Sequence, residues 1–354
     1  MTKVSYAELA ARLALFLSGY LGPSTTIGSP IVPAPPAFGI RLVRGGTGLI
    51  EWFPASTDGF FAAVAASADT DAVLVPAGTY EFTEILYVNT NIAIIGENMQ
   101  TCVVENSTTT GTIFLLKGGS LQNFTINATL SSPGGGSVMW AYGEDERTDT
   151  FINVPYIENV TFNLTITTPN VNLSFIALYW YWEQDLSYNP LAGAMSFTAV
   201  KDVYITIVDA RVGVSYGCDG FLAIYDANSG TAVIDNVNVK IVAGFTNLLA
   251  IEMEPIYEDR GRLEARNCNV DVRAIGYSTY GDTAGFWIMW CNMYDCKAYV
   301  ASLDDATGVY VSGGPILVRD CEVYVEGSQY VYGIEVGWPE SVDIVNCQVE
   351  AVTI

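Results

Sequence analysis

Apolar and polar residues alternate along most of the chain, in short runs that each start with Asn or Asp. One apolar residue follows the Asn or Asp, and alternating strand residues come next, as in Asn123-Phe-Thr-Ile126. The runs start at Asn123, Asn159, Asp202, Asn236, Asn267, Asp295, Asp320 and Asn346. The differences between successive starts are 36, 43, 34, 31, 28, 25 and 26 residues. Repeats in this range indicate one supersecondary unit stacked many times.

A second series of apolar strands precedes these runs from the third repeat onward. Its members are Phe175–Tyr179, Phe221–Tyr225, Leu248–Glu252, Phe286–Met289, Gly308–Val311 and Tyr332–Val336. Alternation along a strand puts one set of side chains inside and the other set on the surface. The two series predict an all-β fold, a single-stranded right-handed parallel β-helix of about nine coils over residues 71–354.

The repeat accounts for several residue types on structural grounds. Asn and Asp tolerate the left-handed backbone conformation, so they suit a turn at the start of each strand, where their side chains can stack in a ladder. One column of the repeat contains Phe124, Val160, Val203 and Val237, followed by Cys268, Cys296, Cys321 and Cys347. The cysteines are therefore expected to be buried core residues.

The first 21 residues predict an amphipathic helix, with Ser5 and Glu8 as a capping box. One face of this helix carries Leu9, Leu13, Phe16, Leu17 and Tyr20. That face either packs on the chain's own β-domain or anchors the chain to another subunit. A proline-rich linker over 22–38 favours the anchor, because such a linker is a stiff spacer. Residues 39–70 are expected to form strands and a helix that cap the β-helix.

Three segments carry a resemblance to a known family. They are the helix around Asp58–Ala66, the turn Val75-Pro-Ala-Gly-Thr-Tyr80 and the strand Asn91-Ile-Ala-Ile-Ile-Gly96. This stretch of about 40 residues resembles the opening of pectate-lyase-like β-helices and of phage tailspikes. The resemblance implies a parallel β-helix. Its tailspike side implies a homotrimeric virion appendage.

The charge of the chain restricts its partners. The formal net charge is −23, with 15 basic residues, so nucleic acid and anionic membranes, which are bound through Lys and Arg, are not expected partners. The chain has no histidine, which excludes histidine triads and histidine-based zinc sites. Seven cysteines without tight pairing indicate neither a disulfide framework nor a metal site. No cofactor or metal is predicted.

Carboxylates are the candidate catalysts. Glu252 and Glu254 are two residues apart on one strand and share a face, and Asp259 follows in a loop. Two further acidic groups lie at Glu144–Glu146 and at Glu183 with Asp185. The simpler interpretation of each acidic group is a solvated corner, or an interface edge in the case of Glu183 and Asp185. The calcium ligands and basic residue of the lyases have no matching cluster in this chain.

Aromatic residues on the second strand series are the stronger sign of binding. The candidates are Tyr179, Trp180, Tyr181, Trp182, Tyr225, Trp287 and Trp290, with Tyr294, Tyr310 and Trp338 beside them. Aromatic surfaces stack on sugar rings and also dominate protein interfaces. The interface is favoured, because the strand Asn346–Ile354 has no predicted cap and is expected to be covered by another chain.

The hypothesis is a structural or adhesive virion subunit, such as a tail spike, fibre or capsid decoration, on the virion surface. It would attach to another virion protein through residues 1–21, form a homo-oligomer, with a trimer favoured, and bind surface polysaccharide. Synthesis in the host cytoplasm is expected because no signal peptide is recognised. One alternative is an extracellular glycosidase or lyase that cleaves polysaccharide with carboxylates. A second alternative is a cell-surface adhesin or filament subunit.

Overall fold

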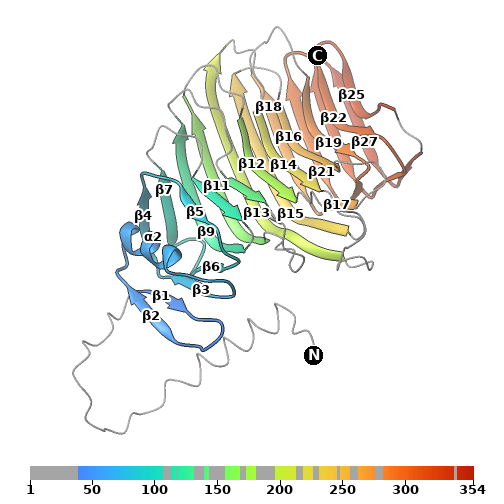
Figure 1. Ribbon diagram of the computed structural model, residues 1–354. Coiled ribbons are helices and arrows are strands. Elements are labelled where there is room, and N and C mark those ends of the chain that lie inside the picture. Colours follow the sequence, from blue (N-terminus) through green and yellow to red (C-terminus); the bar gives the residue numbers. More distant parts are fainter. Residues whose placement is uncertain are drawn as a thin grey trace, which may run out of the picture. The chain divides into compact units, whose positions relative to one another are not determined.

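The computed structural model is nearly all β and contains two large sheets (Figure 1). It describes residues 39–106, 113–117, 119–130, 139–142, 156–167, 173–180, 196–212, 218–225, 231–244, 248–255, 262–275, 282–338 and 341–354. The predicted anchor residues Leu9, Leu13, Phe16, Leu17 and Tyr20 and the linker 22–38 lie outside these residues. The all-β class is confirmed.

The smaller sheet has nine strands, all of them parallel. In spatial order they are β5 (Leu86–Val88), β8 (Phe114–Lys117), β10 (Met139–Tyr142), β12 (Leu173–Trp180), β14 (Cys218–Tyr225), β16 (Leu248–Pro255), β19 (Thr283–Met289), β22 (Ala306–Ser312) and β25 (Val331–Val336). Neighbours in space are therefore also successive repeats in the sequence. The second strand series of the sequence lies in this sheet, in β12 through β25.

The larger sheet has 18 strands and contains the Asn and Asp runs. Its parallel strands are β3 (Ala72–Val75), β4 (Gly78–Phe82), β6 (Ala93–Gly96), β7 (Cys102–Asn106), β9 (Ser120–Leu130), β11 (Tyr156–Ile166), β13 (Ser196–Val212), β15 (Thr231–Gly244), β17 (Arg262–Arg266), β18 (Asn269–Ala274), β20 (Asn292–Tyr294), β21 (Lys297–Ser302), β23 (Ile316–Arg319), β24 (Glu322–Gly327), β26 (Val342–Val345) and β27 (Gln348–Thr353). The remaining two strands, β1 (Ile40–Val43) and β2 (Ile50–Phe53), pair antiparallel with each other, and β1 pairs antiparallel with β3.

All eight repeat-start residues have the left-handed backbone conformation that the sequence predicts. Their φ angles lie between 52° and 63°. Part of the expected ladder is present, because Asn159 Nδ2 donates to Asn123 Oδ1 at 2.8 Å and Asn236 Nδ2 donates to Asp202 Oδ1 at 2.7 Å. Such bonds tie neighbouring repeats together at the bend between strands.

The cysteine column is part of the core, as predicted. Cys268, Cys296 and Cys321 are completely buried, and Cys347, in the last repeat, is half-buried. Burial and the neighbouring thiol of Cys268 raise the pKa of Cys296. The thiols of Cys268, Cys296 and Cys321 are therefore core side chains of low reactivity.

A helix and a hairpin cover the N-terminal end of the described sheets. Helix α2 (Thr57–Ala65) starts at Ser56, whose side chain accepts a hydrogen bond from the Gly59 amide. Phe60 is fully buried against Tyr80 and Phe82, with ring centroids 5.6 and 5.5 Å away. The described residues contain no helix that is both long and apolar enough to cross a membrane.

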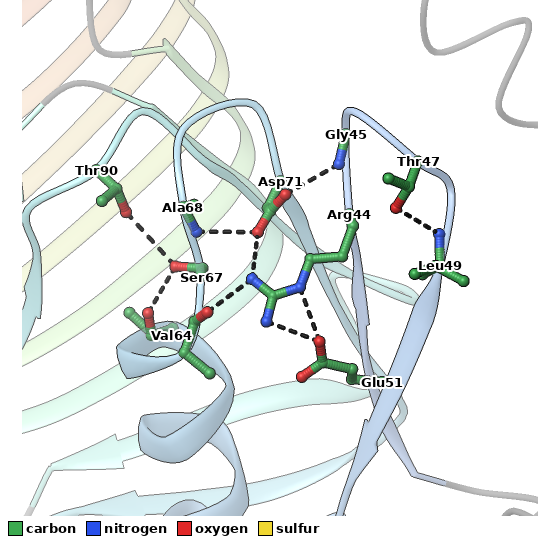
Figure 2. A network of polar contacts seen from close by, with 11 residues as sticks. Arg44, Gly45, Thr47, Leu49, Glu51, Val64, Ser67, Ala68, Asp71 and Thr90 are labelled. Atoms are coloured by element: carbon green, nitrogen blue, oxygen red, sulfur yellow. Dashed lines mark hydrogen bonds and ion pairs between the residues drawn. The ribbon is translucent and has the colours of Figure 1, made fainter.

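One arginine joins this helix to the hairpin and to β3 (Figure 2). Arg44 Nη1 donates to the Ala66 carbonyl at 2.8 Å and to Asp71 Oδ2 at 2.9 Å, and Arg44 Nε donates to Glu51 Oε1 at 2.9 Å. Asp71 is buried and also accepts from the amides of Gly45 and Ala68, each at 2.9 Å. Its carboxylate thus accepts three hydrogen bonds, two from Arg44 and Gly45 in the hairpin and one from Ala68 in the loop after α2.

The last repeat exposes apolar side chains on three strands. Strands β25, β26 and β27 each pair with one neighbour among the described strands. The exposed residues on and beside them are Tyr330, Tyr332, Val336, Trp338, Ile344, Val345, Val349 and Ile354. Val349 is 48% exposed, whereas Val323, its partner in register on β24, is buried.

Candidate functional site

The structure places the predicted site residues at different points of the smaller sheet. Glu252 and Glu254 belong to β16, Trp287 belongs to β19 and Trp290 follows β19. Strand β12 contains Tyr179 and Trp180, and β14 contains Tyr225. Tyr181, Trp182 and Asp259 lie outside the described residues.

Four outward-facing residues form one column across the end of the smaller sheet. Glu252 is the Cα partner of Trp287, Trp287 that of Tyr310, and Tyr310 that of Glu335. We call these four residues the acid–aromatic column. The residues that precede three of them, Ile251, Phe286 and Val309, are completely buried. Strand alternation therefore turns the column toward the outer face.

The two rings of the column are in contact. The ring centroids of Trp287 and Tyr310 are 4.1 Å apart, and the ring planes meet at 31°. Both side chains are half-buried, so the aromatic surface is less exposed than the sequence suggested. A Cβ atom on Gly337 would lie 2.3 Å from Tyr310 Oη, so the glycine makes room for the phenol group.

The carboxylate at the end of the column is held by a hydrogen bond. Thr307 Oγ1 donates to Glu335 Oε2 at 3.3 Å, and Glu335 is half-buried. The column therefore consists of two aromatic rings with a carboxylate residue at each end. A sugar ring can stack on such rings while its hydroxyl groups donate to the carboxylates.

Trp290 has a different role from Trp287. Its backbone has φ 48°, and a Cβ atom on Gly313 would lie 2.4 Å from the Trp290 ring. The indole therefore packs on the backbone of the turn after β22. This tryptophan supports a turn and does not join the acid–aromatic column.

A second aromatic pair lies on the larger sheet. Tyr299 and Tyr324 are partners in register, with ring centroids 5.2 Å apart and ring planes at 4°. Arg273 lies 5.2 Å from the Tyr299 ring and also pairs with Asp271, Nε to Oδ1 at 2.8 Å. Burial and the nearby Glu326 and Glu350 raise the pKa of Tyr324.

This pair and Glu335, at the end of the acid–aromatic column, were not predicted from the sequence, although both occupy a fixed position in the repeat. Asp271, Tyr299 and Tyr324 are each the fourth residue after an Asn or Asp start. The acid–aromatic column follows a small residue and an apolar residue in each strand, as in Gly308-Val-Tyr310 and Gly333-Ile-Glu335. Aligning the strands on these features gives both columns.

The spacing of the carboxylates limits what they can catalyse together. Glu252 and Glu335 are three strands apart, about 14 Å at the usual strand spacing. Paired carboxylates in glycoside cleavage are about 5–9.5 Å apart. Among the described residues, no group of three or more Cys, Asp or Glu could hold a metal ion.

The comparisons with known proteins give only distant likenesses. No protein-family model matches the chain, and no curated protein matches it. A solved structure of ORF18 of Geobacillus virus E2 aligns with 81% of this chain at 11% identity and a TM-score of 0.28, and the chain covers 58% of that protein.

Two Azotobacter vinelandii mannuronan C-5 epimerase A-modules are similar at the same level. Both have 11% identity, with TM-scores of 0.23 and 0.25. The alignments cover 84% and 82% of this chain and 94% and 93% of the modules. Likenesses of this size leave the fold and the function to be argued from the chain's own residues.

Proposed function

We propose that this chain is a right-handed parallel β-helix that serves as an adhesive or structural subunit of a virus particle and binds surface polysaccharide. The observation that carries the binding part is the contact of Trp287 with Tyr310 between two carboxylate residues in register. The β-helix is supported by parallel pairing between successive repeats in both sheets. The proposed place in a virus particle is supported by the resemblance of the opening segment to phage tailspikes.

Rigidity is what the fold contributes to adhesion. Each residue of the acid–aromatic column is fixed by a neighbour one repeat away, and the strands beneath it are packed on a continuous core. A rigid aromatic surface binds with little loss of side-chain entropy. Binding of a polysaccharide along the column therefore requires no rearrangement of the described strands.

The test is retention of the full-length protein on immobilised surface polysaccharides, with Tyr310→Ala compared with Tyr324→Ala. Each substitution removes one half-buried tyrosine from an aromatic pair, but the pairs lie on different sheets. We expect Tyr310→Ala to weaken binding at least about tenfold, about 1.4 kcal/mol, and Tyr324→Ala to leave it unchanged. Equal effects of the two substitutions, or no retention of the unsubstituted protein, would refute the proposal.

The attachment and the association of copies are parts of the same proposal. Residues 1–21 would bind another virion protein, and the exposed apolar residues of β25–β27 would be covered by a further copy in a homo-oligomer, with a trimer favoured. The mass of the full-length protein in solution, measured beside a variant that starts at Gly39, tests both. A trimer that is lost in the shorter variant supports the anchor, and a monomer in both cases contradicts the association.

Cleavage of polysaccharide is the second candidate. Glu252 and Glu254 lie two residues apart on β16, and glycosidases use a pair of Asp or Glu residues as acid and base or nucleophile. Glu252 also lies beside Trp287 in register. Release of reducing ends from a bound polysaccharide, abolished in Glu252→Gln, would establish this activity. Intact polysaccharide after long incubation would exclude it.

A further inference from the structure

The larger sheet has a stacked aromatic pair on the outer face of its last repeats. Tyr299 of β21 and Tyr324 of β24 are partners in register, and their rings are almost parallel, with centroids 5.2 Å apart. Val323 and Val325, on either side of Tyr324, are buried, so strand alternation turns Tyr324 outward. The strands around the pair, β18, β21, β24 and β27, all lie within the described residues. The surroundings of the two rings can therefore be compared position by position.

The Tyr299 ring already has a cation over it. Arg273 of β18, which pairs with β21, places its guanidinium carbon 5.2 Å from the centroid of the Tyr299 ring. The same guanidinium forms an ion pair with Asp271, the Cα partner of Tyr299, with Nε 2.8 Å from Oδ1. The aromatic face attracts the cation, and the carboxylate holds the arginine in place. Tyr299 and Asp271 thus form an arginine site within the chain.

The Tyr324 ring has a carboxylate beside it but no arginine over it. One face of the ring is stacked on Tyr299, so the opposite face is turned toward β27, where Glu350 is the Cα partner of Tyr324. Glu350 therefore lies beside Tyr324 as Asp271 lies beside Tyr299. In the part of the chain that the structure describes, no guanidinium lies over the Tyr324 ring. We call the face toward β27 the open face.

A second carboxylate flanks the open face. Glu326 follows Tyr324 by two residues on β24 and is the Cα partner of Val352. Val352 occupies the register position on β27 that Arg273 occupies on β18. Among the residues described, neither Glu326 nor Glu350 forms an ion pair. Two uncompensated carboxylates beside an aromatic face favour a cation from outside the chain.

The chain itself indicates which cation suits such a face. The other arginines that lie over aromatic rings are Arg41, Arg266 and Arg319. Lysine faces a carboxylate instead, as in Lys297, whose Nζ is 2.7 Å from Glu322 Oε2. A planar guanidinium can stack on a ring and donate to a carboxylate at the same time. The open face therefore fits an arginine better than a lysine.

We propose that Tyr324, Glu326 and Glu350 bind an arginine side chain of a partner protein. The guanidinium lies on the open face of the Tyr324 ring and donates to the two carboxylates, as Arg273 does in the preceding arginine site. The formal net charge of −23 favours a basic segment of another protein over a second copy of this chain. The site is separate from the acid–aromatic column and does not depend on polysaccharide binding.

The test is binding of a tetra-arginine peptide to the full-length protein, with a tetra-lysine peptide as the comparison. Calorimetric titration is done at about 0.15 M salt, where exposed charges more than about 8 Å apart are largely screened. We expect the arginine peptide to bind at least about threefold more tightly, because its guanidinium groups stack on the ring. Equal affinities, or no binding of the arginine peptide, would overturn the proposal.

Substitutions locate the binding. Tyr324→Leu removes the ring but keeps an apolar side chain, and it should weaken binding of the arginine peptide about three- to fivefold. Glu350→Gln should weaken it about two- to fourfold. Glu51→Gln is the matched control, because it removes the same charge from the N-terminal hairpin, and it should leave the affinity unchanged. Equal effects of Glu51→Gln and Glu350→Gln would show attraction to the net charge alone and would contradict the site.

A further variant fills the site from within the chain. In Val352→Arg the new side chain lies two residues after Glu350, as Arg273 lies two residues after Asp271. We expect it to cover the open face and to weaken peptide binding at least about tenfold. Val352→Lys adds the same charge without the planar group and should weaken binding less. Equal losses in the two variants would overturn the role of the ring.

Other occupants are distinct outcomes of the same experiment. Binding of a glucosamine polymer that is lost in Tyr324→Leu, without binding of the arginine peptide, would assign the site to a cationic polysaccharide and overturn the proposal. A lower mass in solution for Tyr324→Leu than for the unsubstituted protein would assign the site to a second copy and also overturn it. None of these outcomes changes the test of the acid–aromatic column with Tyr310→Ala.

Discussion

Gly308 of β22 lies against Val323 of β24 so closely that a Cβ atom on the glycine would be 2.2 Å from Val323 Cγ1. The same approach recurs one repeat later, where a Cβ atom on Gly333 would be 2.0 Å from Val349 Cγ1. A valine of the larger sheet therefore occupies the space that a side chain on the smaller sheet would need. This contact sets how near the two sheets come at their edge.

We predict that Gly308→Ala destabilises the protein by about 1–3 kcal/mol, because the added methyl group overpacks a core position. Denaturant unfolding measures the change. Gly46→Ala is the matched control, since a Cβ atom there meets nothing within 4 Å, and it should change stability by less than about 0.5 kcal/mol. Equal effects of the two substitutions would contradict the close approach.

Asp71→Asn should also be destabilising, by about 1–3 kcal/mol, because the amide cannot accept all the donated bonds of the carboxylate. The N–H groups of Gly45, Ala68 and Arg44 converge on Asp71, so an amide nitrogen would face donors. Glu51→Gln is the control, since Glu51 is about half exposed in its ion pair with Arg44. This substitution should lower the free energy of unfolding by less than about 1 kcal/mol.

The stabilisation from Asp71 should depend on pH in one direction. Burial raises its pKa, but the bonds from Ala68, Gly45 and Arg44 outweigh burial and hold the pKa below the usual value. A depressed pKa stabilises the fold above the unfolded value of about 3.9, and this contribution is lost as the pH falls through the folded pKa. The stability difference between the unsubstituted protein and Asp71→Asn should therefore shrink below about pH 4. A difference that grows on acidification would show the opposite shift.

Local signals were sufficient to predict the all-β class and the conformation of the repeat-start residues. Asn267 and Asp320 both occur where a strand run begins, and both have left-handed φ angles. Asn and Asp tolerate the left-handed backbone conformation better than other residues with a side chain, so the sequence pattern alone predicts where that conformation occurs. Burial of Cys321 followed from the same alignment.

The acid–aromatic column was harder to predict, because its members come from different repeats. Glu252 and Trp287 were identified separately, one as a catalyst and one as a binding residue. Their position side by side depends on the register between β16 and β19, which in turn depends on the length of the connection between the strands. Glu335 is recognised only when its strand is aligned with that of Tyr310, because the signal lies in the repeat and not in the residues around Glu335.

The repeat-start conformation gives a test at a single residue. Asp320 has φ 56°, so Asp320→Val should destabilise the protein by about 1–2 kcal/mol, the cost of a side chain that disfavours the left-handed region. Asp320→Gly should cost much less, because glycine adopts this conformation readily. Denaturant unfolding of both variants separates the effect of backbone conformation from the loss of the carboxylate. Equal destabilisation by the two substitutions would mean that the carboxylate, and not φ, matters.

Thiol labelling should follow the burial of the cysteine column. Cys347 is half-buried, whereas Cys268, Cys296 and Cys321 are fully buried. Burial raises the pKa of Cys296, and the hydrogen bond with Cys296 together with burial raises the pKa of Cys321. We predict that iodoacetamide labels Cys347 at least about a hundredfold faster than the other three, because those require opening of the sheets, which costs about 3 kcal/mol or more. Mass spectrometry of peptides from the labelled protein measures the rates.

In denaturant the four rates should converge, and Cys347→Ser should remove only the fast-labelled site while the other three stay protected. Val203 and Val237 occupy the same column in earlier repeats, so Cys296→Val should keep the fold and the protection of its neighbours. Rapid labelling of Cys296 or Cys321 in the folded protein would show that the cysteine column is open to solvent. The last repeats would then be packed differently from the arrangement in which Val323 lies against Gly308.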